Sequence, residues 1–238
     1  MNVLAAGPVI PSFGQGSSCE KANGWFCTEW LRAHWADTLQ PALVQHVELT
    51  LIAIGCGFAI SFALALIGFR YRLLDAPLGV VSDFLYTIPS LALFQLLVPI
   101  TGLTVTTVEI ALVSYTLLIL YRNIVEGLRG VPRDVLEAAR GMGFTRAQTF
   151  FRVELPLAVP TIVAGLRIAT VSTISIATVA AFVLPKGLGH PIFIAVQQDL
   201  FKTEILAAGG LAVALALCAD ALLALSQRLL TPWSGRHT

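Results

Sequence analysis

The chain has 238 residues, of which 56% are hydrophobic and 12% are charged, and its formal net charge is +1. Soluble domains carry about a quarter charged residues, so this composition excludes an ordinary soluble protein, and the mean hydropathy of +0.81 agrees. Most of the surface must therefore face membrane lipid, and no nucleic-acid partner is expected.

The first 43 residues are expected to form an extracytoplasmic segment. Residues 1–15 contain neither a basic start nor a sustained apolar stretch, so we expect no signal peptide. Large apolar side chains then recur over residues 24–40, at Trp25, Phe26, Trp30, Leu31 and Trp35. Because tryptophan favours the bilayer interface, an interfacial helix on the external surface is expected. That helix either anchors the chain on the membrane or contacts an external protein that delivers substrate.

Four cysteines are too few for a disulfide scaffold. Cys56 and Cys218 lie in apolar runs and are interpreted as small hydrophobic residues. Cys19 and Cys27 share the N-terminal segment, and they can form a disulfide only if that segment lies outside the cytoplasm. Their pairing stays open at this point.

Five apolar stretches are long enough to cross a bilayer, which requires about 20 residues. They predict an all-α integral membrane protein with about five transmembrane helices, in a membrane domain over residues 44–230. The stretches are residues 49–69, 79–100, 103–121, 158–184 and 205–230. The second contains Pro89, and a proline inside a span usually marks a kink that lines a cavity.

Two charged residues within the spans are expected to form a structural ion pair. At 1.5 Å per residue, Arg167 in the fourth span and Asp220 in the fifth both lie roughly 13 Å from the cytoplasmic edge. Either charge alone would be costly in the membrane, so equal depth with opposite sign predicts a pair. Asp83 starts shallower and matches less well. Glu109 has two interpretations, because it can attract cationic groups or sit at the external interface.

The distribution of Lys and Arg predicts the orientation of the spans. If the loop between the third and fourth spans is cytoplasmic, internal segments hold ten Lys and Arg residues and external segments hold four. This difference favours an external N-terminus and an internal C-terminus, with residues 231–238 as a cytoplasmic tail.

The polar loop over residues 122–157 carries the most specific pattern in the chain. It reads Glu137-Ala138-Ala139, then Gly143, then Val153-x-Leu155-Pro156. A short helix is expected over residues 133–140 and a second over 146–153, the second capped by Thr145 and limited by Pro156. Glycines at 141 and 143 permit the sharp reversal between them. Ala138 and Ala139 would leave a surface that another protein can approach closely.

This spacing resembles the cytoplasmic loop of permeases of binding-protein-dependent ABC importers, which reads E-A-A, glycine and I-x-L-P at the same offsets. The resemblance implies a type I ABC importer permease core with cytoplasmic coupling helices that sit in a groove of an ATPase. It implies two ATP-binding subunits, a second permease that is a similar chain or a copy of this one, and an extracytoplasmic solute-binding protein. Since the chain contains no G-x-x-x-x-G-K-[ST] loop, ATP and Mg are expected on the partner ATPase. The coupling residues are then Glu137, Ala138, Ala139, Gly143, Val153, Leu155 and Pro156.

Further stretches narrow the resemblance to osmoprotectant permeases, over roughly residues 49–225. They are Thr87-Ile88-Pro89-Ser90-Leu91-Ala92-Leu93, Arg122-Asn123 and Ala164-Gly165-Leu166-Arg167, together with the loop. The resemblance implies import of glycine betaine, carnitine, choline or proline betaine, with an importer of amino acids or another small solute as the alternative. Aromatic faces hold quaternary ammonium groups. The candidate path residues are Tyr86, Thr87, Pro89, Ser90, Phe94, Tyr115 and Phe182.

Two other classes fit less well. An ion-driven secondary carrier would need internal repeats and coupling-ion sites, which five spans do not obviously provide. The sequence shows no metal-ligand spacing and no Ser/His/Asp or paired-carboxylate arrangement at a plausible depth. Neither a metal site nor a catalytic site is therefore expected within this chain.

Overall fold

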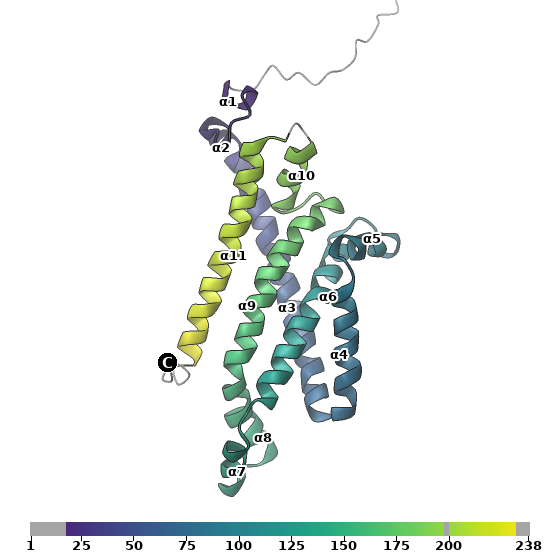
Figure 1. Ribbon diagram of the computed structural model, residues 1–238, viewed down its shortest axis with the longest axis vertical. Coiled ribbons are helices and arrows are strands. Elements are labelled where there is room, and N and C mark those ends of the chain that lie inside the picture. Colours follow the sequence, from purple (N-terminus) through teal and green to yellow (C-terminus); the bar gives the residue numbers. More distant parts are fainter. Residues whose placement is uncertain (1–17, 198–199, 232–238) are drawn as a thin grey trace, which may run out of the picture.

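A computed structural model describes residues 18–197 and 200–231, and these residues form helices without a strand. The predicted all-α class is confirmed. The elements are α1 (Ser18–Lys21), α2 (Thr28–His34), the π-helical η1 (Trp35–Leu39), α3 (Gln40–Arg70), α4 (Arg72–Thr87), α5 (Ser90–Thr101), α6 (Val105–Arg129), α7 (Arg133–Gly141), α8 (Arg146–Thr149), the π-helical η2 (Phe150–Glu154), α9 (Leu155–Val179), the 3-10 turn η3 (Ala180–Phe182), α10 (Gly189–Gln197) and α11 (Lys202–Leu230). In Figure 1 the long helices run side by side, with α7 and α8 at one end and α1, α2 and α10 at the other.

Four helices are long and apolar enough to cross a membrane, namely Thr28–Arg70, Val105–Arg129, Arg146–Phe182 and Lys202–Leu230. The bent pair Arg72–Thr87 and Ser90–Thr101 makes a fifth if it counts as one span. The expectation of about five spans therefore agrees with the structure. Of the predicted C-terminal tail, only Thr231 is described, and residues 1–15, where no signal peptide is expected, also lie outside the described ranges.

The centre of the bundle is formed by α3, α6 and α9, whose backbones approach closely at small residues. A Cβ added to Gly57 of α3 would overlap the Thr116 side chain of α6, and one added to Gly165 of α9 would overlap Asn123 of α6. Between membrane helices, where lipid removes the hydrophobic drive for association, such close contact supplies the packing energy.

The second span is broken where α4 meets α5. The two helices are bent by 98°, and Pro89 stands at the N-cap of α5, where it has no N–H with which to continue α4. The Tyr115 hydroxyl of α6 donates a hydrogen bond to the carbonyl oxygen of Ile88. A neighbouring helix thus satisfies the backbone acceptor at the break, as irregular backbone in a membrane requires. The predicted kink at Pro89 is confirmed.

A disulfide between Cys19 and Cys27 closes the N-terminal segment, which decides the pairing that the sequence left open. The bounds expected for the interfacial helix are wrong, because the helix begins at Thr28 and continues through η1 into α3. Trp30 is buried with its ring 5.4 Å from that of Phe201. One face of this aromatic segment therefore packs on the protein, while Trp25 stays exposed.

A buried histidine connects α3 to α9 and to the turn before α10. His46 is fully buried, with Nε2 3.0 Å from the carbonyl oxygen of Ile174 and Nδ1 3.2 Å from the Leu188 nitrogen. Since the Leu188 N–H donates to Nδ1, the proton of the neutral ring lies on Nε2.

The two cysteines of the apolar runs, Cys56 and Cys218, lie exposed on the outer surface of their helices.

Candidate coupling surface and intramembrane polar residues

The loop with the E-A-A pattern forms a tight turn between α7 and α8 (Figure 1). Gly143 has a φ of +79°, a left-handed conformation that costs other residues about 1–2 kcal/mol. The N–H groups of Met142, Gly143 and Phe144 donate to the carbonyls of Ala138, Arg140 and Ala139, at 3.0, 2.9 and 3.1 Å. The reversal expected in this loop is present at Gly143, whereas Gly141 belongs to α7.

The second helix of the loop is longer than the sequence predicts. Thr145 and Gln148 form a capping box at its start, which supports the predicted cap. The expected end at Pro156 is wrong, because α8 continues through η2 into α9 and Pro156 lies in the first turn of α9. In the first turn a helix tolerates a residue that lacks an N–H, and the π-helical residues Phe150–Glu154 precede it.

The seven predicted coupling residues differ in exposure. Glu137, Ala138 and Gly143 are exposed, and Val153, Leu155 and Pro156 are half-buried along the continuous helix. Ala139 is only 1% exposed, so the expectation that both alanines form an accessible surface is wrong for Ala139. Successive helical residues point in directions about 100° apart, and this register turns Ala139 inward.

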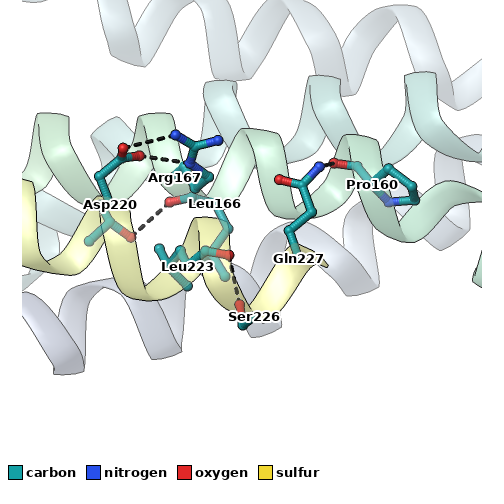
Figure 2. A network of polar contacts seen from close by, with 8 residues as sticks. Pro160, Leu166, Arg167, Asp220, Leu223, Ser226 and Gln227 are labelled. Atoms are coloured by element: carbon teal, nitrogen blue, oxygen red, sulfur yellow. Dashed lines mark hydrogen bonds and ion pairs between the residues drawn. The ribbon is translucent and has the colours of Figure 1, made fainter. Parts of the chain in front are cut away.

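The ion pair expected between the fourth and fifth spans is present in the structure. Arg167 Nε lies 2.7 Å from Asp220 Oδ1, and Arg167 Nη2 lies 2.8 Å from Oδ2, so the contact is bidentate. Figure 2 shows the two side chains pointing toward each other from α9 and α11, with Gln227 reaching the carbonyl oxygen of Pro160 further along. Both charged side chains are about one third exposed. Polar contacts thus hold α11, whose own surface is mostly exposed, against α9.

Two further ion pairs, both between α4 and α6, were not predicted from the sequence. Arg122 Nη2 lies 2.5 Å from Asp83 Oδ2, and Arg129 Nη1 lies 2.6 Å from Asp75 Oδ2. Tyr121 also donates to Asp75 at 2.7 Å. Asp75, Tyr121, Arg122 and Arg129 line a pocket of about 700 Å³ between α4 and α6.

The predicted path residues separate into two groups. Tyr86 and Tyr115 meet at the α4–α5 bend with ring centroids 5.9 Å apart, beside the exposed Thr87 and Pro89 and the partly exposed Ser90. Phe94 is fully buried in the apolar core, so no surface of this subunit presents it to a solute. Phe182 is exposed and stacks edge-on with Phe193, at 4.8 Å.

Glu109 lies in the second turn of α6. Both of its carboxyl oxygens are buried without a hydrogen-bond partner among the described residues. Neither interpretation of Glu109 from the sequence included such burial. Among the same residues no group of three His, Cys, Asp or Glu side chains is placed to hold a metal ion.

The chain is similar to known protein components of membrane transport systems. A family model described as "Binding-protein-dependent transport system inner membrane component" matches residues 53–232. A choline transport system permease protein of Bacillus subtilis (strain 168) is 35% identical over 189 residues, which cover 79% of this chain and 86% of that protein. A glycine betaine/carnitine/choline transport system permease protein of the same organism is 34% identical, with the same coverage of 79% and 86%.

A solved structure has the same fold. The MetNI methionine ABC transporter, in an inward-facing conformation, matches with a TM-score of 0.72 at 18% identity. The match covers 86% of this chain and 100% of that chain. The helical arrangement in Figure 1 is therefore the fold of that transporter chain.

Proposed function

The chain belongs to the family of binding-protein-dependent transport system inner membrane components, and on this premise we propose that it is the permease subunit of an importer for osmoprotectants. The proposed substrates are glycine betaine, carnitine, choline and proline betaine. The observation that carries this proposal is the match, over 79% of the chain, to permeases named for choline and for glycine betaine, carnitine and choline. As a multi-pass membrane subunit of an ABC importer, the chain leaves ATP hydrolysis to a separate ATPase subunit.

The α7–α8 turn is proposed to be the ATPase-coupling surface. Its exposed residues Glu137, Ala138 and Gly143 form the contact, while Ala139 packs beneath them and Val153, Leu155 and Pro156 connect the turn to α9. The continuous helix from Arg146 to Phe182 supports this role, because it transmits a displacement at the turn directly into the membrane. Two ATP-binding subunits, each with ATP and Mg, would bind the two permeases of a complete transporter.

The proposed orientation places the coupling turn in the cytoplasm and the N-terminus outside. The disulfide at the N-terminal end supports this assignment, because disulfides persist in oxidising compartments. The opposite end carries the arginines of α3, α4, α6, α7 and α8, as the positive-inside rule requires. An extracytoplasmic solute-binding protein would then deliver substrate to the end that holds α1, α2 and α10.

The complete pathway is proposed to need a second permease, either a similar chain or a copy of this one. The half-exposed ion pair of Arg122 and Asp83 supports this, because an intramembrane charge must face protein or water rather than lipid. Within this subunit the proposed path includes Tyr86 with Thr87, Pro89 and Ser90 at the bend, supported by Tyr115 behind them. Phe182 lies near the external end, and the buried Phe94 shapes the path only indirectly.

An importer of amino acids or another small solute is the alternative. It is favoured by the fold shared with a transporter named for methionine, since one fold serves many substrates. An ion-driven secondary carrier is a lesser alternative, and the family membership argues against it.

The test is uptake into proteoliposomes that contain the complete transporter, its ATPase and the solute-binding protein. We expect ATP-dependent accumulation of labelled choline or glycine betaine, and none without the ATPase. Accumulation of methionine or histidine but of no betaine would overturn the substrate assignment, and uptake driven by an ion gradient without ATP would overturn the class. Purification with two differently tagged permease chains shows whether the chain pairs with a copy of itself.

A further inference from the structure

A pocket beside the coupling turn is lined by residues that the proposed coupling role does not use. Its volume is about 650 Å³, and it lies between the last turn of α3 and the α7–α8 segment. The α3 side contributes Leu66, Phe69 and Arg70, and the loop side contributes Arg140, Phe144, Arg146 and Phe150, among others. The pocket therefore joins the edge of a membrane span to the proposed ATPase contact.

Three arginines line this pocket and face a single carboxyl group. Arg70, Arg140 and Arg146 are exposed, and none has a carboxylate within 4.0 Å among the described residues, whereas other arginines at this end do. The only acidic residue in the lining is Glu154. Like charges gathered around one cavity repel one another, and guanidinium groups are suited to bidentate contacts with phosphate. The charge pattern thus fits an anionic ligand.

The apolar residues of the lining favour a lipid over a soluble anion. Leu66 and Phe69 lie within four residues of Arg70, the last residue of a helix long and apolar enough to cross a membrane, so the proposed orientation places their side chains at the boundary between hydrocarbon and headgroups. Phe150 adds a further apolar wall from η2. A soluble anion gains little from such a wall, whereas a phospholipid presents a phosphate and acyl carbons together. Basic pockets beside membrane helices on the cytoplasmic side are suited to anionic headgroups.

We propose that this pocket binds one anionic phospholipid of the cytoplasmic leaflet, with its phosphate between Arg70, Arg140 and Arg146 and its acyl end against Leu66 and Phe69. The inference rests on the proposed orientation, which places the coupling turn in the cytoplasm. Because Arg70 belongs to α3 and the other two arginines belong to α7 and α8, the lipid ties the coupling turn to the membrane edge. The position of the turn, and hence its fit to an ATPase, would then depend on lipid composition.

The test measures phosphatidylglycerol bound to the delipidated complete transporter by native mass spectrometry. In Arg70→Gln/Arg146→Gln, binding should weaken about 25-fold, from about fivefold for each basic residue removed. Arg133→Gln/Arg228→Gln is the matched control, since it removes two exposed arginines that do not line the pocket. The control should stay within about twofold of the unmodified transporter, and phosphatidylcholine should bind weakly to all three.

Each other outcome has a defined meaning. Equal losses in the two double variants would overturn the site in favour of general surface charge, and no loss in either would overturn it outright. Displacement of the lipid by inorganic phosphate would identify a soluble anion instead. Binding to the permease alone but not to the complete transporter would mean that the ATPase fills the pocket. ATPase retention and ATP-driven uptake, measured in parallel, test the proposed function separately from the lipid site.

Discussion

The α9–α11 ion pair and the α7–α8 turn stabilise the chain in contrasting ways. Arg167 and Asp220 lie 53 positions apart in the sequence, and their side chains join two membrane helices. The turn instead depends on the backbone of Gly143 and on hydrogen bonds between residues at most five positions apart. Loss of one charge leaves its partner unpaired within the membrane, whereas strain at the turn stays local. The ion pair should therefore determine the stability and abundance of the subunit. The turn should determine how well ATP hydrolysis is coupled to uptake.

The largest effect is expected for Asp220→Asn. Removing one partner of an ion pair leaves an uncompensated charge, which is more costly than losing the pair. The melting temperature of the purified subunit should fall by about 5–10 °C, and the amount in the membrane should fall with it. The double replacement Arg167→Asp/Asp220→Arg should recover part of the loss, and a single variant as stable as the unmodified chain would contradict the assignment.

Gly143→Val should leave the subunit in the membrane and weaken the coupling of ATP hydrolysis to uptake. A β-branched residue at the left-handed position costs about 1–2 kcal/mol of backbone strain, enough to shift the turn. We expect normal abundance and about tenfold lower ATP-driven uptake, with Gly141→Ala as the control because Gly141 has open space around it and no positive φ. Full uptake by the valine variant at normal expression would show that coupling does not depend on the conformation of this turn.

Glu137→Ala should have a smaller effect at the same surface. Glu137 is exposed, and an exposed charge contributes little to binding because water competes with its partner. Retention of the ATPase during purification should weaken by about two- to fivefold, and added salt should reduce the difference between the variant and the unmodified chain. A difference that persists in high salt would mean that the carboxylate is buried on ATPase binding.

The smallest effect on stability is expected for Asp83→Asn, which sharpens the comparison between the two intramembrane ion pairs. The side chains of Arg122 and Asp83 are 57% and 42% exposed and make a single contact, unlike the bidentate pair of Arg167 and Asp220. The melting temperature of the isolated subunit should change by about 2 °C or less. A loss as large as that of Asp220→Asn would show that exposure in the isolated subunit does not predict the cost.

The features predicted correctly are those that depend on neighbouring residues or on the constant rise per residue of a helix. Apolar length gives the spans, Thr145 and Gly143 give a cap and a reversal, and equal depth pairs Arg167 with Asp220. Errors arise where a helix continues past a residue that often ends one. Pro156 was expected to stop the second loop helix, but the π-helical turn before it and its place in the first turn of α9 allow one helix to continue.

Other features depend on distant parts of the chain and leave no local pattern. His46 contacts the carbonyl oxygen of Ile174, 128 positions away, and nothing near His46 indicates that partner. The inward direction of Ala139 depends on how α7 packs, which the motif does not encode. In the sequence, the three arginines of the proposed lipid pocket indicate only the orientation of the spans. Their common position in one pocket depends on how the α7–α8 turn folds against the end of α3.

Contacts between the N-terminal segment and the start of α11 bear on the order in which the subunit assembles. The Cys27 N–H donates to Thr203 Oγ1 at 3.0 Å, and the Thr203 hydroxyl donates to the Gly24 carbonyl oxygen at 2.9 Å. Synthesis proceeds from the N-terminus, so α11 emerges from the ribosome after both of its anchors, Arg167 and the disulfide loop. A nascent chain that stops before Lys202 would leave Arg167 without the carboxylate of Asp220. It would also leave the disulfide loop without the hydroxyl of Thr203. An incomplete subunit therefore lacks the contacts that hold α11 at both of these places.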